Sequence, residues 1–249
     1  MSDFIIASIV FVCCLGGALI GLVLPVPHRD ADSKDTVKLV MGLVATMSAL
    51  VLGLLIATAK SSYDAQLTSV QEIAADMIQL DQRLARFGPE TRAIRTKFRN
   101  DALRVRALIW SPQGGQAAAL DPTNSAREVE AIRDDIQDLV PKTNAQQDDR
   151  AKALELLSTI RRSRILTFVA MTNQIPLPLL IVLVLWVMAL FIGFGLFARF
   201  NLTVMLSLLI GALSIAAAIF LILELNHPYS GLLRISDTPI QYALSLIRQ

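Results

Sequence analysis

The sequence has few of the residues that build metal centres and disulfide frameworks. It contains two cysteines and two histidines in 249 residues. Cys13 and Cys14 are adjacent within an apolar run, so they cannot link distant segments of the chain. Two histidines are too few for a multi-histidine metal site. We therefore expect no metal ion and no organic cofactor.

The sequence also lacks the motifs of the common enzyme classes. It has no phosphate-binding loop, nucleophile elbow, HExxH zinc motif or paired cysteine ligands. No motif that reads a nucleic-acid groove accompanies its basic residues, and the net charge is only +2. These absences argue against an enzyme and against a nucleic-acid-binding protein.

Apolar residues are what the sequence has in excess. They make up 54% of the chain, against 18% charged residues, which is typical of a membrane protein. Four uncharged runs of about 20 residues can each span a hydrocarbon layer of roughly 30 Å, since a helix rises 1.5 Å per residue. The runs cover residues 4–24, 39–59, 177–198 and 202–223. We expect an all-α, multi-pass membrane protein with four transmembrane helices.

The second run continues without a break into a charged segment, so one helix is expected to extend from the membrane as a stalk. Gly88 and Pro89 should end this helix. Beyond Lys60 its apolar residues follow the heptads of a coiled coil. One core position holds Tyr63, Val70, Met77 and Leu84, and the other holds Gln66, Ile73, Leu80 and Phe87.

Residues 60–174 have a charged, helical pattern and are expected to form a bundle of four helices. After the stalk come a basic helix over 90–110, a helix that starts at a capping box of Ser125 and Glu128, and a helix from Asn144 to Gln174. Pro141 should end the helix that starts at Ser125. The expected domains are thus 1–59 and 175–223 for the spans, 60–174 for the stalk and bundle, and 224–249 for a C-terminal turn and helix.

The basic helix carries six cationic residues against Glu90 and Asp101, a local charge of +4. It could present an ordinary solvated face, a surface for anionic lipid headgroups, or an electropositive vestibule for anions. The helix after Ser125 has an acidic face and is expected to pair with the basic helix over 90–110. The cationic residues are Arg92, Arg95, Lys97, Arg99, Arg104 and Arg106.

The C-terminal segment contains an amphipathic helix that begins at Pro239, with Asp237 or Thr238 as its cap. This helix is too short to span a membrane. It must lie in the membrane interface, fold against the bundle, or re-enter between the spans.

Small residues recur every four positions on the second span, which favours close helix packing or a narrow passage. Both uses are compatible in a homo-oligomer whose second helices surround an axis. The small residues are Ala45, Ala49, Gly53, Ala57 and Ser61. On the first span, Gly17 and Gly21 form a GxxxG pair that lets another helix approach. Oligomer packing is expected to involve Ala45, Ala49, Gly53, Ala57, Tyr63, Val70 and Met77.

Charged residues at the membrane edge are the candidates for a pore mouth, with Ala49, Gly53 and Ala57 behind them. Lys60 and Arg234 could form a cationic ring that His227 tunes with pH. Alternatively, Lys60 snorkels to the membrane surface while Glu224 and Arg234 form an ion pair.

The Lys and Arg tally gives an expected orientation. Four spans place both termini and the bundle on the same side of the membrane. That side carries six flanking basic residues, and the other side carries four: Arg29, Lys34, Lys38 and Arg199. The positive-inside rule then predicts a cytoplasmic bundle and cytoplasmic termini in an inner (plasma) membrane.

Three segments of the chain resemble the bestrophin-like family of mostly bacterial membrane proteins. They are LGLLIATAKSSYD (52–64), LDQRLARFGPETRAIR (80–95) and HPYSGLLRIS (227–236). A more remote resemblance to the true bestrophins, which are pentamers, implies a four-span homo-oligomer with cytosolic termini and a pore lined by the second helix. The second span here has no phenylalanine, and the segment after the fourth span has no acidic run, so calcium gating is not implied.

Two functions remain open from the sequence. The first is a homo-oligomeric channel in the lipid bilayer for chloride or other small anions. The second is a membrane-anchored scaffold or sensor that relays the state of the membrane through its helical domain.

Overall fold

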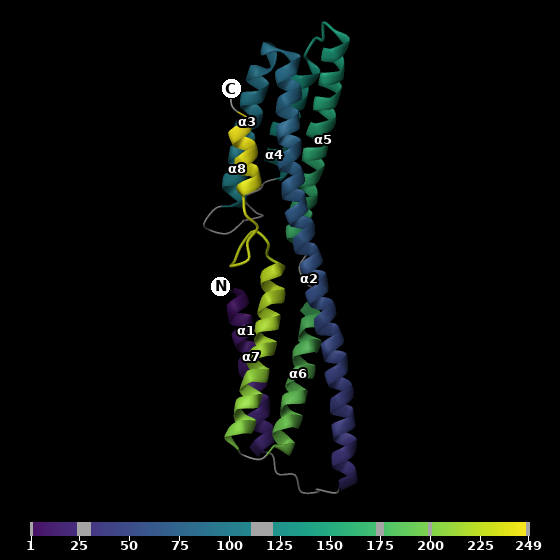
Figure 1. Cartoon of the computed structure of the whole chain (residues 1–249), viewed down its shortest axis with the longest axis vertical. Coiled ribbons are helices and arrows are strands. Elements are labelled where there is room, and N and C mark those ends of the chain that lie inside the picture. Colours follow the sequence, from purple (N-terminus) through teal and green to yellow (C-terminus); the bar gives the residue numbers. More distant parts are fainter. Residues whose placement is uncertain (1, 24–30, 111–121, 173–176, 199–200, 248–249) are drawn as a thin grey trace. The chain divides into compact units, whose positions relative to one another are not determined.

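The computed structural model describes residues 2–23, 31–110, 122–172, 177–198 and 201–247, and these residues form helices and turns with no strand among them. The chain divides into two compact units (Figure 1). The span unit consists of Met1–Ser62 and Gln174–Asn226. The bundle unit consists of Tyr63–Asn173 and His227–Gln249.

All four predicted spans are helical, and all four helices are long and apolar enough to cross a membrane. The span unit contains three of them whole and the first half of the fourth, α2. The helices are α1 (Ser2–Val23), α2 (Ala31–Phe87), α6 (Leu177–Phe197) and α7 (Leu202–Leu225).

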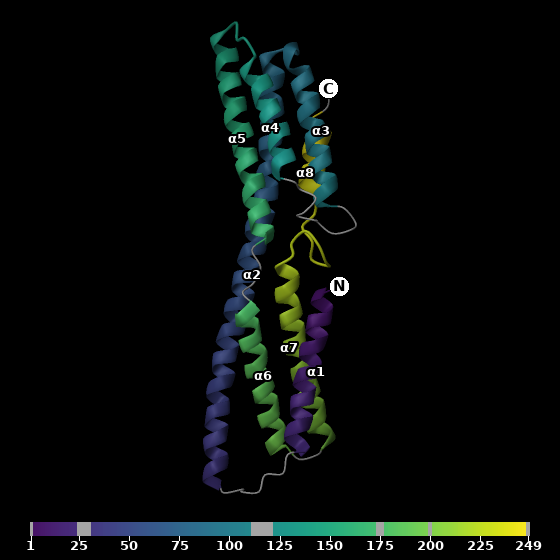
Figure 2. The same cartoon turned by 180° about the vertical axis from the view of Figure 1, so that it is seen from behind.

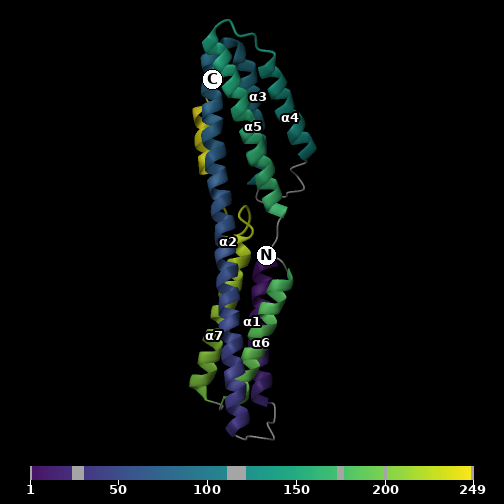
Figure 3. The same ribbon diagram turned by 90° about the vertical axis from the view of Figure 1, so that its right-hand side faces the viewer.

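Glycines allow α1 and α6 to pack closely together. The two helices run side by side in Figures 2 and 3. A Cβ atom at Gly17 would lie 3.1 Å from the carbonyl oxygen of Met188, and one at Gly21 would lie 2.8 Å from the backbone nitrogen of Leu196. Such distances leave no room for a side chain. The GxxxG pair of the first span thus allows the close helix contact that its sequence predicts.

The bundle unit is built from the second half of α2 and four further helices. These are α3 (Arg92–Ile109), α4 (Pro122–Gln137), α5 (Asn144–Thr172) and α8 (Thr238–Leu246). Its core is lined by buried aliphatic side chains from each of these helices. Four of the helices correspond to the predicted bundle.

The turn from α2 to α3 is where the sequence places it. Gly88 has a φ of 143°, in the region that favours glycine, and a short 3-10 helix (Pro89–Thr91) follows. The buried Thr91 hydroxyl donates to the carbonyl oxygens of Leu84, at 2.6 Å, and Gly88, at 2.8 Å. These bonds fix the reversal of direction between the two helices.

The start of α4 differs from the prediction. The helix begins at Pro122, so Ser125 lies within it and is not its N-terminal cap. Proline suits the first turn of a helix because its missing N–H would have no partner there. The loop predicted over 111–125 falls mostly on residues 111–121, which are outside the described residues.

Of the three alternatives for the C-terminal segment, the structure selects packing against the bundle. Four side chains of this segment are buried in the same core as α2 to α5: Ile240, Ala243, Leu244 and Ile247. The helix begins at Thr238, with Asp237 at its N-cap position. Its apolar face is therefore covered by the chain itself.

Candidate functional site

The membrane half of α2 is the least covered of the four spans. In its most apolar stretch 11% of the residues are buried, against 33% in α1, 39% in α6 and 28% in α7. One contact with α6 is at Met41, whose side chain lies against Gly193. Large parts of this helix therefore face away from the rest of the span unit.

The small residues of α2 lie on this uncovered surface. Ala49, Gly53 and Ala57 are exposed, and a Cβ atom at Gly53 would meet no atom within 4 Å among the described residues. Ala45, which was predicted to share their role, is half-buried.

The structure extends this face at both ends. Gly42 and Thr46 are exposed below Ala49, and Lys60 is exposed beyond Ala57. Steps of three and four residues place these positions on one face of a helix. We call this face the α2 stripe: Gly42, Thr46, Ala49, Gly53, Ala57 and Lys60. Gly42 and Thr46 were not among the predicted pore residues, although they continue the same spacing.

The heptad residues beyond the membrane have a different role from the one predicted. Val70 and Met77 are buried at 3% and 1% exposure in the core of the bundle unit, and Tyr63 packs against that core. Val70 and Met77 are covered by helices of the same chain, so these two side chains are not available to pack against another copy, whereas Tyr63 is half-buried. An apolar heptad face needs cover, and here α3, α4, α5 and α8 supply it.

The four charged or titratable edge residues belong to different units. Lys60 and Glu224 lie in the span unit, where Lys60 is exposed and Glu224 is buried in the last turn of α7. His227 and Arg234 lie in the bundle unit, where His227 is half-buried in a turn and Arg234 is exposed.

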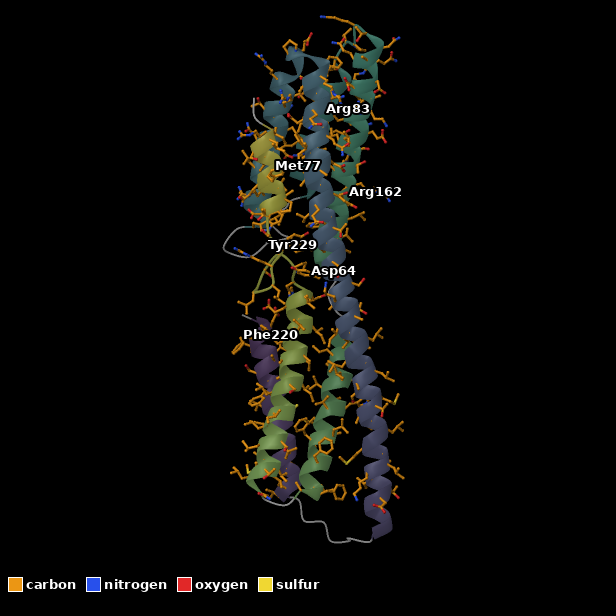
Figure 4. The ribbon with its side chains drawn as sticks, viewed as in Figure 1. Asp64, Met77, Arg83, Arg162, Phe220 and Tyr229 are labelled. Carbon is orange, nitrogen blue, oxygen red and sulfur yellow. The ribbon has the colours of Figure 1, made fainter. Side chains whose placement is uncertain are left out.

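The turn that contains His227 is anchored to the bundle core by Tyr229 (Figure 4). The Tyr229 hydroxyl donates to the Gln66 side-chain oxygen at 3.0 Å, and its ring meets Trp110 edge to face at 5.7 Å. The Trp110 indole donates to the carbonyl of Ile235 at 2.8 Å. Burial raises the pKa of the Tyr229 phenol, which keeps it protonated as a donor.

The cationic residues of α3 are largely paired with carboxylates. Arg95 makes two bonds to Asp81, of 2.6 and 2.9 Å. The predicted pairing with the acidic helix is confirmed by two contacts with α4, Lys97 to Asp135 at 2.7 Å and Arg104 to Glu128. These pairs favour an ordinary structural role for most of the charge on this helix.

The fourth pair on α3 fastens the C-terminal segment. Arg106 Nε donates to Asp237 Oδ2 at 2.7 Å, and Gln241 donates to the same oxygen at 2.8 Å. Burial alone would raise the pKa of Asp237, but the hydrogen bonds from Gln241 and Arg106 outweigh it and lower the pKa. Asp237 thus joins α3 to α8 as a charged acceptor.

The family model for the Bestrophin-like domain matches residues 8–240, nearly the whole chain. Among solved structures, the fold is similar to that of a bacterial bestrophin homologue from Klebsiella pneumoniae that carries an isoleucine-to-threonine mutation. The TM-score is 0.64 at 10% identity, over 96% of this chain and 98% of the other. No curated protein matches the chain. With four apolar spans and this family match, the chain is a membrane protein and belongs to the Bestrophin-like family.

Proposed function

We propose that this protein is a homo-oligomeric membrane channel that passes small anions, with the α2 stripe facing the axis between copies. The observation that carries this proposal is the exposure of the stripe within a span that its own chain covers so little. The resemblance to bestrophins, which implies a pentamer with a pore lined by the second helix, supports the same arrangement.

The side chains of the stripe suit a narrow passage between helices. Glycine, alanine and threonine let neighbouring backbones approach each other closely, which helix association in membranes requires. Large apolar side chains occupy other exposed positions of α2, where lipid or a neighbouring copy can cover them: Leu39, Leu43, Leu50 and Leu54. The helix thus offers a small-residue face and an oily face.

The charge at the end of the stripe supports anions as the permeating species. Lys60 is the cation that follows the uncharged part of the stripe, and it is exposed. In an oligomer each copy contributes one such charge. A ring of fixed positive charge concentrates anions and repels cations, more strongly at low salt because screening is weaker.

Chloride flux from liposomes tests the proposed function. Chloride-loaded liposomes that contain the purified protein should release chloride faster than protein-free liposomes. In planar bilayers with a salt gradient, the reversal potential should lie near the equilibrium potential of chloride. The absence of any conductance over a range of pH and membrane tension would overturn the channel and favour a scaffold or sensor.

We also propose the orientation that the basic residues predict, with the bundle unit and both termini in the cytoplasm of an inner-membrane protein. Val140 is 77% exposed in the bundle unit, so Val140→Cys in a Cys13→Ala, Cys14→Ala background presents one accessible thiol. A membrane-impermeant thiol reagent should label it only after the cells are permeabilised. Labelling in intact cells would show that the bundle unit lies on the opposite side of the membrane.

A further inference from the structure

A pocket in the bundle unit is lined by three arginines of α3, of which Arg95 is paired with Asp81. It has a volume of about 330 Å³. Its lining combines one face of α3 with one residue of α2 and one that follows α8: Arg92, Ala93, Arg95, Thr96, Arg99, Asp81 and Ile247. This volume is at the lower end of the range for small-molecule sites, about 300–1,000 Å³.

The spacing of the three arginines brings them to one wall of the pocket. Arg92, Arg95 and Arg99 are separated by three and four residues, so they share a face of α3. Their opposing charge within the pocket lining is the single carboxylate of Asp81. Three positive charges and one negative charge leave a local charge of +2.

Each arginine has a different status in the structure. Arg95 is held by its two bonds to Asp81, which also raise its pKa, so it forms a fixed part of the wall. Arg92 is exposed at the pocket. The Nε of Arg99 is buried, and within the part of the chain that the structure describes it has no hydrogen-bond partner.

A buried guanidinium nitrogen without an acceptor indicates a missing partner, because buried donors are nearly always paired with protein, water or an ion. The remaining cations of α3 already have carboxylate partners from α3, α4 and the segment before α8. An anion that fits beside Asp81 would supply the acceptor that Arg99 Nε lacks among the described residues, and the exposed Arg92 could bind the same anion.

We infer that this pocket binds a phosphate-bearing anion through Arg92 and Arg99. A local charge of +2 matches a doubly charged phosphate or phosphate monoester better than a single chloride. Arginine forks bind phosphate oxygens with paired hydrogen bonds. The volume leaves room for an organic group attached to the phosphate. This inference does not depend on ion conduction, so either can fail without the other.

Inorganic phosphate serves as the probe, with the full chain in nanodiscs of phosphatidylcholine. The melting temperature should rise with phosphate concentration and saturate, as expected for a ligand that binds the folded state, whereas chloride at the same ionic strength should not reproduce the rise. Isothermal calorimetry gives the affinity directly. Phosphate binding by Arg92→Gln and Arg99→Gln should each be weakened by about tenfold or more, because a hydrogen bond to a charged group is lost.

Two controls separate the site from general charge effects. Arg162 on α5 is exposed and lies outside the pocket lining, so Arg162→Gln should bind phosphate like the unmodified chain (Figure 4). Arg99→Lys keeps the positive charge at this position. Comparing it with Arg99→Gln separates the loss of that charge from a folding defect. Equal phosphate affinity in the unmodified chain, Arg92→Gln and Arg99→Gln would overturn the inference.

The two sources of a phosphate group are distinguished by the lipid. Binding of free phosphate in phosphatidylcholine discs assigns a soluble ligand. A rise in melting temperature only in discs that contain phosphatidic acid, and its loss in Arg99→Gln, assigns a lipid headgroup. If the melting temperature rises neither with free phosphate nor with phosphatidic acid, the inference is overturned.

Discussion

Lys60→Glu is expected to change the protein from anion-selective to cation-selective in planar bilayers. A unit charge 4 Å from an ion changes the ion's energy by about 1 kcal/mol in bulk water and about 4 kcal/mol near a protein surface. Reversing its sign doubles this change, and every copy in an oligomer contributes. Because about 1.4 kcal/mol corresponds to a factor of ten, the permeability ratio of chloride to sodium should fall by about tenfold or more. The measurement is the reversal potential in a salt gradient.

Charge variants away from the stripe serve as the controls for this experiment. Lys60→Arg keeps the charge and should keep the selectivity. Lys152 is exposed on α5, where its ammonium group pairs with Glu155 at 2.8 Å, so Lys152→Glu tests a charge reversal outside the span unit. An unchanged reversal potential in Lys60→Glu would show that this residue does not face the conduction path.

Gly53→Leu is expected to abolish assembly while leaving each copy folded. A Cβ atom at position 53 would meet no atom within 4 Å among the described residues of its own chain, and leucine favours the helix over glycine by up to about 1 kcal/mol. In an oligomer, the same side chain would separate backbones that pack through the α2 stripe. The mass of the particle in mild detergent should fall to that of one chain, with an unchanged helical circular dichroism spectrum.

Two other glycines make this result specific. A Cβ atom at Gly16 on α1 also has no neighbour within 4 Å in the part of the chain that the structure describes, so Gly16→Leu should assemble normally if the interface is the α2 stripe. Gly21 faces the backbone of α6, and Gly21→Leu should instead reduce the yield of folded protein. An oligomer of normal mass in Gly53→Leu would rule out the stripe as an assembly surface.

The spans and most helix ends could be predicted because they depend on local signals. An uncharged run of about 20 residues has few alternatives to a membrane helix, and Gly88 and Pro89 end α2 by backbone geometry alone. The start of α4 was predicted four residues late because a capping pattern at Ser125 competed with Pro122. Two valid helix-start signals near each other cannot be ranked without the surrounding structure.

The sequence could not determine which segment packs against each apolar helix face. A heptad stripe shows that Val70 and Met77 need cover, but the pattern is the same whether another copy or the same chain supplies it. The C-terminal helix had three possible positions for the same reason. The pairing of Arg106 with Asp237 spans 131 positions, so no local pattern could have indicated it.

The bundle core is completed by side chains that are synthesised after all four spans. Tyr229, Ile235 and the α8 residues share one core with helices between positions 63 and 173, yet α6 and α7 intervene in the chain. During synthesis, the early helices must wait with part of their apolar surface uncovered until both later spans have been made. Membrane insertion of α6 and α7 and closure of the bundle are thus consecutive steps of biogenesis, and a failure of the first leaves the second without its final element.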